Sequence, residues 1–403
     1  MSDQCIARIE TPYLLLLNIS LIRKDGRFWA DPLWHKDLLL HLVAVERLTL
    51  ACPIDGGAVP PDWLPIDEPR ITILPLPPLG RRTLFDLPLI AARLWRAIGG
   101  ARIVHTGIAG WPFPLGWVAV PIARMRGRLL MIGVESSFWR VPAGVKASPI
   151  KRFQAAIYER INRLCLDAAD ITFFTTEEYR RSLLRRPRGA SHVAPATWVD
   201  PEHLIDASAL DAAWAAKDGR LLFAGRLTEA KGVAVLIRAI ERSAARVDII
   251  GEGDLLGEIA ALAGRHPGRV RLLESVRYGA EFFALLDRYS AIIVPTLSEE
   301  QPRVLFDAFS RGVPAIVSDT SGNRQLVHDG IEGRLVRTGD ADALAAALDG
   351  VAADCAGFAQ MGRSARATMD DRTHEAMHRD RGRIIAQALR RHDLGHRPAG
   401  VSN

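Results

Sequence analysis

Cysteine is scarce in this chain, and its few cysteines lie far apart. The four are Cys5, Cys52, Cys165 and Cys355, and no two of them form a CxxC pair. Structural zinc sites and disulfide frameworks place cysteines in close pairs or at regular short spacings. The pattern therefore argues against a zinc ribbon and against a disulfide-stapled fold. We expect reduced, buried thiols.

Long apolar runs are also lacking. The longest run near the start covers residues 13–17 with Ile19, far fewer than the roughly 20 residues that a membrane-spanning helix requires. Asp3, Glu10 and the lack of a small-residue cleavage site argue against a signal peptide. We therefore expect a cytosolic protein, with at most peripheral contact to the inner face of the membrane.

Lysine supplies only six of the 52 basic residues, and the positive charge is unevenly distributed. Residues 1–200 carry 26 Lys and Arg against 18 Asp and Glu, a net charge of +8, whereas residues 201–403 carry 26 against 28, a net charge of −2. A basic surface suits anionic lipid, a phosphorylated acceptor or nucleic acid, and an ordinary solvated surface explains the counts equally well. We expect contact with an anionic membrane surface and none with nucleic acid.

The length and the ordinary composition favour two globular domains. A chain of 403 residues exceeds what one hydrophobic core usually serves. Both halves alternate short apolar runs with helical stretches, which is typical of parallel sheets covered by helices. The sequence therefore predicts an α/β fold with two doubly wound, Rossmann-like domains.

The expected elements follow the apolar pattern. In the first half we expect strands at 13–19, 48–52, 71–74, 103–105, 129–134 and 171–174, and helices at 84–98 and 150–168. In the second half we expect strands at 221–224, 247–250, 270–273, 292–294 and 315–318, and helices at 233–243, 255–264, 281–289, 304–311 and 323–328.

The rhythm of strand and helix is interrupted at 194–218, which we take as the boundary between domains. We expect an acceptor-binding domain at 1–198 and a nucleotide-binding domain at 199–372. A charged helix at about 373–391 is expected to pack back on the first domain.

Basic residues follow the first strand of the second half. Gly225-Arg226-Leu227 comes directly after that strand, and Lys231-Gly232 precedes the next helix. Ligands of open α/β sheets bind at the carboxyl ends of strands, and a helix start attracts anions. An Arg fork and a Lys charge five residues apart suit a diphosphate, although a surface cation pair has the same spacing.

A glycine-rich turn follows the second strand of this half. Gly251, Gly253 and Gly257 with Glu274 imitate a dinucleotide-binding fingerprint and suggest an NAD-dependent oxidoreductase. The spacing to the third glycine is one residue too long, and the unit is the second of its domain rather than the first.

Carboxylates and small residues follow later strands. Glu299 lies after the strand at 292–294 and Asp307 lies in the first turns of the next helix, so both can accept hydrogen bonds from a polyol. Residues 318–322 form another turn of small residues. The segment Asp340-Ala-Asp342 resembles a DxD metal site, but capping of the following helix explains it better.

Taken in this order, these elements resemble the GT4 family of retaining glycosyltransferases, which have the GT-B architecture of two Rossmann-like domains facing a cleft. The matching pieces are Gly225–Leu227 with Lys231-Gly232, residues 251–253, 276–295, the Glu299 and Asp307 pair, 311–314 and 318–322. The first half matches more loosely, through 103–105, 168–170 and 175–177.

The resemblance implies roles for single residues. Arg226 and Lys231 would bind the donor diphosphate, Glu299 the hydroxyls of the transferred sugar and Asp307 the nucleotide ribose. The loop at Val276 would contact the base. It also implies catalytic roles for Glu299, Arg226, Lys231 and His105, donor contacts from Gly253, Arg303 and Val304, and no metal.

The chain departs from the family pattern at several positions. Asp307 stands where the family usually has Glu, and Glu300 and Pro302 stand where it commonly has glycines, a change for which Arg303 offers a compensating charge. The family's histidine near the sugar is Gly107 here, so a structural role for His105 fits as well as a catalytic one. Glu135 is a further polar residue expected at the cleft.

The sequence thus predicts transfer of a sugar from a nucleotide diphosphate donor to a saccharide or lipid-linked acceptor in cell-surface polysaccharide or glycolipid synthesis. The donor base remains open among UDP, GDP and ADP. The alternatives are a non-catalytic nucleotide-sugar-binding protein, an NAD-dependent oxidoreductase and, since they share the architecture, a sugar-nucleotide epimerase.

Overall fold

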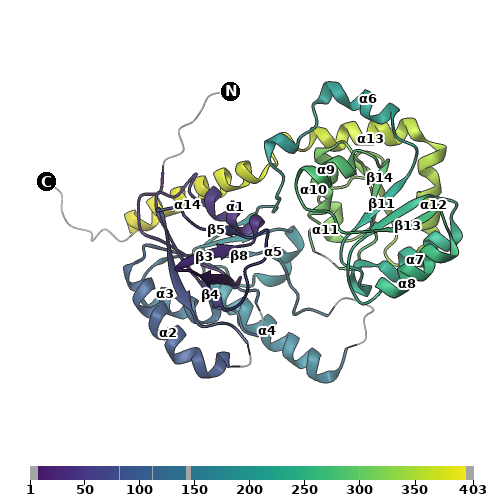
Figure 1. The fold of residues 1–403 in the computed structure, drawn as a ribbon. Helices are drawn as coiled ribbons and strands as arrows, with labels where there is room; N and C mark the ends of the chain where they lie inside the picture. Colours follow the sequence, from purple (N-terminus) through teal and green to yellow (C-terminus); the bar gives the residue numbers. More distant parts are fainter. Residues whose placement is uncertain (1–7, 81, 111, 142–146, 299, 396–403) are drawn as a thin grey trace.

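The structure, a computed structural model, describes residues 8–80, 82–110, 112–141, 147–298 and 300–395. Cys5 and Glu299 lie outside the described residues. The chain forms two largely parallel β-sheets, each covered by helices, as Figure 1 shows. The strands expected at 171–174 and 221–224 belong to different sheets.

The first sheet has a parallel core in which seven strands lie in the order β6-β4-β1-β7-β8-β9-β10. The strands are β1 (Tyr13–Leu16), β4 (Leu48–Asp55), β6 (Ile71–Leu76), β7 (Ile103–Gly107), β8 (Leu129–Val134), β9 (Ile171–Phe174) and β10 (Ala190–Val193). The helices α2 (Thr83–Gly100), α3 (Gly116–Met125), α4 (Pro149–Asp167) and α5 (Glu177–Leu183) connect them.

Both faces of this sheet are buried along its central strands, which explains why β1 and β8 are almost entirely apolar. Leu14 and Leu16 of β1 pack into one core with α2, whereas Tyr13 and Leu15 pack into a second core on the opposite face. Alternate side chains of a strand point to opposite faces, so one short run supplies both cores.

A small ribbon extends this sheet beyond β4. It consists of β2 (Leu21–Lys24), β3 (Arg27–Ala30) and β5 (Leu64–Pro65), and β2 pairs antiparallel with β3. The hairpin turns on Asp25 and Gly26, which both have positive φ, as tight hairpin turns require. Helix α1 (Pro32–His41) follows, capped by the Asp31 side chain.

The second sheet has the strand order β13-β12-β11-β14-β15-β16, which is the Rossmann order. Its strands are β11 (Leu221–Ala224), β12 (Val247–Ile250), β13 (Val270–Leu273), β14 (Ala291–Val294), β15 (Ala315–Ser318) and β16 (Gly333–Val336). Its helices include α7 (Val233–Arg242), α8 (Leu256–Arg265), α9 (Ala280–Leu286), α10 (Val304–Ser310), α11 (Ser321–Arg324), α12 (Ala341–Ala353) and α13 (Cys355–Ala367), and α6 (Leu210–Ala215) precedes β11.

The last helix, α14 (His374–Gly395), lies against the first sheet's half of the molecule and contacts α1, as its yellow ribbon in Figure 1 shows. Ile385 and Ala386 are buried in the same core as Leu38 of α1. The His374 backbone N–H donates to Val199 O at 2.7 Å, which fixes the start of the helix.

Several expectations from the sequence are wrong in detail. Cys355 is exposed, because it opens α13 at the surface beside its cap Asp354. The strand expected at 13–19 ends at Leu16, because the Asn18 amide donates to Phe113 O and turns the chain away. The helix expected at 323–328 is α11, which ends at Arg324.

Candidate functional site

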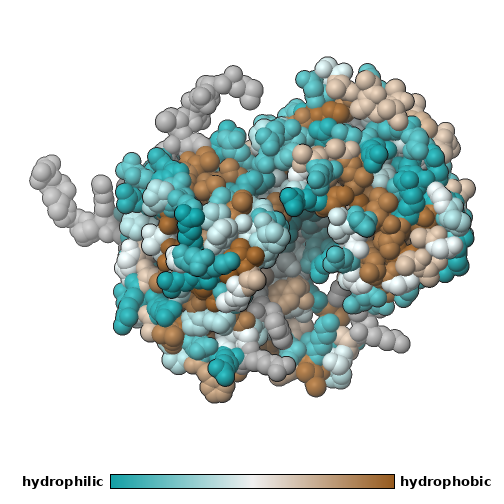
Figure 2. Space-filling view, viewed as in Figure 1, coloured by the Kyte–Doolittle hydropathy of each residue, from teal (hydrophilic) through white to brown (hydrophobic). Residues whose placement is uncertain are grey.

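Three adjoining cavities lie where the carboxyl ends of the two sets of parallel strands face each other. The central cavity, of about 380 Å³, is lined by residues of both halves, including Glu135 and Ser136 after β8 and Arg226 after β11. A cavity of about 360 Å³ adjoins it on the second sheet, and one of about 320 Å³ adjoins it on the first. The surface is hollowed between the two halves in Figure 2.

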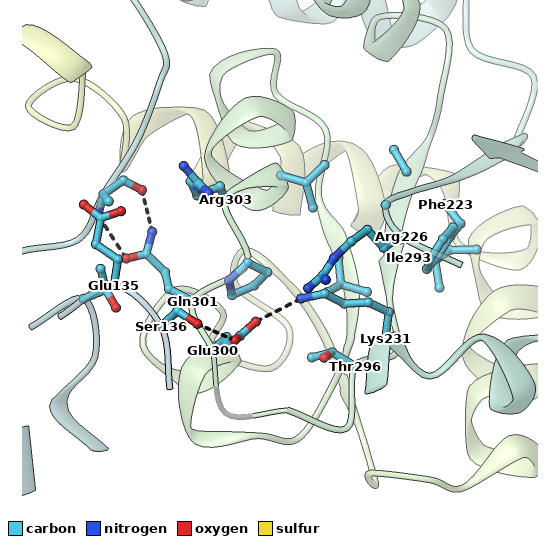
Figure 3. A pocket seen from close by; sticks show the side chains of 17 residues that line it. Glu135, Ser136, Phe223, Arg226, Lys231, Ile293, Thr296, Glu300, Gln301 and Arg303 are labelled. Atoms are coloured by element: carbon cyan, nitrogen blue, oxygen red, sulfur yellow. Dashed lines mark hydrogen bonds and ion pairs between the residues drawn. The ribbon is translucent and has the colours of Figure 1, made fainter. Parts of the chain in front are cut away.

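Arg226 and Lys231 both reach the central cavity (Figure 3). Strand β11 ends at Ala224, and the exposed Arg226 follows in the loop. Lys231 ends a 3₁₀ turn that Gly232 closes with a φ of 74°. A Cβ at Gly232 would lie 1.8 Å from Pro295 O, so only glycine lets this turn pack against the end of β14.

Lys231 is paired across the cavity. Its Nζ lies 3.3 Å from Glu300 Oε2, and the Ser136 hydroxyl donates to Glu300 Oε1 at 3.1 Å (Figure 3). Both charged side chains are one quarter exposed, so water screens the pair and an anionic ligand can compete for Lys231. Glu300 thus links the second sheet's loop to the first sheet.

Two more residues of the same loop contact the segment that joins the halves. Gln301 accepts from Ala196 N at 3.0 Å and donates to Ala196 O at 2.6 Å. The Arg303 guanidinium lies over the Trp198 ring, 5.5 Å from its centroid, and lines the central and first-sheet cavities. These contacts hold the loop at 300–303 in place. They leave the Arg303 guanidinium facing the cavities, where it can interact with an anionic ligand.

The second-sheet cavity holds a buried carboxyl group. Asp307 lines it together with Val276, Tyr278 and Val304, and the Tyr278 hydroxyl donates to Asp307 Oδ1 at 2.8 Å. Burial raises the pKa of Asp307 to about 7, against the opposing effects of the Tyr278 hydrogen bond and the Arg303 charge. The cavity therefore offers apolar walls, a buried carboxyl group and, at its border with the central cavity, the Arg226 charge.

His105 lies in the first-sheet cavity instead. Its Nδ1 is 2.8 Å from the Tyr13 hydroxyl, and burial holds the pKa of its imidazole well below the usual range. His105 is therefore neutral at pH 7. It lines this cavity with Asp37, His41 and Arg381.

The structure thus divides the candidate donor-binding residues between two neighbouring cavities. Arg226, Lys231, Arg303 and Val304 share the central cavity, whereas Val276 and Asp307 lie in the cavity beside it. Within the described part of the chain, Gly253 lines none of the three cavities.

Gly253 is instead required by backbone packing. A Cβ on it would lie 2.5 Å from Leu227 O, which accounts for a glycine at this turn. Ser136, Tyr278 and Gln301 line the cavities although sequence reasoning had not singled them out. Their positions directly after strands or before a helix are the only sequence signal that could have found them.

The molecule has two Rossmann-like sheets whose strand ends face each other across a cleft. This arrangement is the GT-B fold. Sucrose-phosphate synthase from Thermosynechococcus elongatus superposes with a TM-score of 0.71 at 18% identity, covering 95% of this chain and 100% of that one. HepE from Anabaena, in complex with UDP, superposes with a TM-score of 0.65 at 15% identity, covering 94% and 100%.

Sequence comparison is more specific for the second half. Residues 218–354 match the family described as Glycosyl transferases group 1. A phosphatidyl-myo-inositol mannosyltransferase from Mycolicibacterium smegmatis is 34% identical over 236 residues, 56% of this chain and 59% of that protein. The amylovoran biosynthesis glycosyltransferase AmsK from Erwinia amylovora is 32% identical over 141 residues, 32% of this chain and 35% of that protein. The chain spans less than two thirds of the length of these relatives.

Proposed function

We propose that this protein is a retaining glycosyltransferase of the GT4 type, which moves a sugar from a nucleotide diphosphate donor to a saccharide or lipid-linked acceptor. The observation that carries the proposal is the convergence of Arg226 and Lys231 on a cavity between the two sheets. The family match over residues 218–354 covers both of these residues and supports the same function.

We place the base and ribose of the donor in the second-sheet cavity, and its diphosphate and sugar in the central cavity. The base and ribose occupy the second-sheet cavity, where Val276 supplies an apolar wall and Asp307 accepts from a ribose hydroxyl. The diphosphate lies at Arg226, which lines both this cavity and the central one. The sugar then extends into the central cavity towards Glu135 and Ser136, and Glu299 is proposed to contact its hydroxyls.

Transfer needs little chemistry from the protein itself. The bond from the sugar's anomeric carbon to the diphosphate oxygen breaks, a bond to the acceptor oxygen forms on the same face, and the acceptor proton passes to the leaving phosphate. Arg226 and Lys231 stabilise the negative charge that develops on this phosphate, and such electrostatic stabilisation is usually the largest contribution to catalysis. Lys231 exchanges Glu300 for the phosphate when the donor binds.

The acceptor is proposed to enter the first-sheet cavity. Trp34 and Trp198 supply aromatic walls there, and Arg381 and Arg303 supply positive charge. Aromatic rings with nearby cations suit a saccharide that carries a phosphate. The names of the similar proteins, which include a phosphatidyl-myo-inositol mannosyltransferase and an amylovoran biosynthesis enzyme, agree with an acceptor used in glycolipid or cell-surface polysaccharide synthesis.

A peripheral membrane contact is proposed on the first half. Helix α4 exposes Ile150, Phe153, Ile157 and Leu164 along one stripe, with two cations at 151–152 beside it. Helix α2 exposes Leu84 and Phe85, and α3 contacts both α2 and α4. Figure 1 shows α2 and α4 along the lower edge of the first half, and Figure 2 shows apolar residues among polar ones there. Apolar side chains flanked by cations suit an anionic lipid surface.

None of the helices in the described ranges has the length and apolar character needed to cross a membrane.

A thermal-shift panel of UDP-, GDP- and ADP-sugars tests the donor class. A ligand that binds only the folded protein raises the apparent Tm, by an amount that grows with concentration over Kd. We expect one nucleotide series to shift the Tm, and the corresponding free diphosphate to shift it as well. NADH serves as the control for a dinucleotide site, and a shift with NADH alone would contradict the proposal.

A further inference from the structure

Three buried side chains converge between α1 and α14, away from the donor cavity. Asp37 comes from α1, and His374 and His378 come from the first turns of α14. Their exposed fractions are 8%, 1% and 4%. His374 and His378 are four residues apart on a helix, so their side chains lie on the same face.

The three facing atoms form a nearly equilateral triangle. Asp37 Oδ1 lies 3.1 Å from His374 Nε2 and 2.9 Å from His378 Nε2, and the two Nε2 atoms are 3.2 Å apart. A tetrahedral cation with bonds of 2.0–2.2 Å places its ligand atoms about 3.3–3.6 Å from one another, so the three atoms would move apart by a few tenths of an ångström on binding. The triangle therefore has nearly the dimensions of one face of such a site.

Hydrogen bonds alone satisfy this cluster poorly. If both imidazoles carry a proton on Nε2, both donate to Asp37 Oδ1, but the two protonated nitrogens then face each other at only 3.2 Å. If either Nε2 lacks a proton, its lone pair faces the carboxylate instead. Nδ1 of His374 is buried with no hydrogen-bond partner in the described part of the chain, so Nε2 makes the ring's polar interactions.

We propose that Asp37, His374 and His378 bind one divalent transition-metal cation, with Zn²⁺ as the best match. Two neutral imidazoles and one carboxylate are ordinary zinc ligands, and zinc sites with three protein ligands leave the fourth position for water or a ligand. Oxygen-seeking Mg²⁺ and Ca²⁺ suit this ligand set less well.

The surroundings leave the site available to a cation. The neighbouring His41 Nδ1 lies 2.8 Å from Asp37 O and 3.5 Å from Asp37 Oδ2, which leaves Oδ1 to the two histidines of α14. Arg381 also lines the first-sheet cavity, where it donates to Ala194 O and lies over the Phe173 ring. Asp37 and His374 also line the first-sheet cavity, so a ligand in that cavity can supply the fourth position.

The cation fastens the last helix to the first half of the molecule. Its ligands join residues more than 330 positions apart, at the point where α14 begins. The spacing His-Glu-x-x-His is also that of zinc metalloproteases, in which the Glu is the general base. Glu375 is not among the described residues that line the cavity beside the cluster, so the structure assigns a structural role and not hydrolysis.

Metal content tests the site independently of sugar transfer. The full-length protein is incubated with ZnCl₂, freed of loose metal by gel filtration and analysed by plasma mass spectrometry. We expect about one zinc per chain in the wild type and in His266→Gln, a control at the end of α8, and at least a tenfold loss in the double variant His374→Gln, His378→Gln.

Asp37→Asn keeps the shape and removes the negative charge, so it should weaken zinc binding while circular dichroism shows the fold intact. Co²⁺ in place of zinc should give the visible absorption of a tetrahedral site in the wild type and in His266→Gln, but not in the double variant. A wild-type protein that holds less than a tenth of an equivalent of zinc, or a double variant that holds as much as the wild type, would overturn the proposal.

Discussion

At the residue scale, Asp307 is the carboxyl group of the proposed donor site whose pKa is most clearly shifted. Burial raises its pKa from 3.8 to about 7, so the folded protein binds its proton more tightly than the unfolded chain does. The stabilisation from this proton is complete below pH 3.8 and is lost as the pH rises through 7.

We predict that Asp307→Asn removes this pH dependence. The free energy of unfolding of the wild type, minus that of the variant, should fall between about pH 4 and pH 7 by up to about 4 kcal/mol and level off above. Urea unfolding at a series of pH values measures the difference. Parallel profiles for the two proteins would show that Asp307 ionises normally.

The sequence predicted residues that follow strands better than residues that meet across the fold. Arg226 and Lys231 could be found because a strand end and a helix start bracket them within a few positions. The Glu300 contact with Ser136 joins residues 164 positions apart, so no local pattern signals it. The same holds for Asp37 and His378, although the spacing of the two α14 histidines was a usable clue.

At the element scale, strong apolar runs were predictable and short polar elements were not. The strands at 129–134, 171–174, 221–224, 247–250, 270–273 and 315–318 have the expected ends, because each is a short, mostly apolar run and all but the edge strand at 270–273 are largely buried. Strand β2 has two charged residues in four, and β3 exposes Arg27, so neither has the apolar pattern of a buried strand. Their order depends on pairing with each other and with β4.

Helix α4 carries the element-scale prediction. Its exposed Phe153 and Ile157 lie on the stripe proposed to contact lipid. We predict that the double change Phe153→Ser, Ile157→Ser weakens association with anionic vesicles at least tenfold, because each apolar side chain contributes about 1.5–3 kcal/mol at full burial and even partial burial of two of them exceeds about 1.4 kcal/mol. Vesicle sedimentation at several salt concentrations measures the partitioning.

Ile331→Ser is the matched control, because Ile331 is a similarly exposed apolar residue on the second half of the molecule. It should leave vesicle association unchanged. Association of the wild type should also weaken as salt rises, since screening already acts within about 8 Å at physiological ionic strength. Equal partitioning of the wild type onto neutral vesicles would contradict a charge-assisted contact.

At the scale of the whole molecule, two sheets present their strand ends to one cleft, and the proposed chemistry lies where they meet. The GT-B fold was predictable because both halves repeat strand and helix with ordinary spacing. The loop at 300–303 was not predictable, because its shape depends on contacts with Ser136, Ala196 and Trp198 from the other side of the cleft.

The proposal for the whole molecule depends on the diphosphate assignment of Arg226 and Lys231. The most direct test measures steady-state transfer and donor Kd for Arg226→Ala and Lys231→Ala, with Arg265→Ala on the exposed face of α8 as the control. If both cations act on charge that develops in the transition state, each variant should lose on the order of a hundredfold in kcat, with a smaller change in donor Kd. The control should transfer sugar at the wild-type rate. Wild-type rates in both cavity variants would contradict the assignment, and with it the proposal that this cleft transfers sugar.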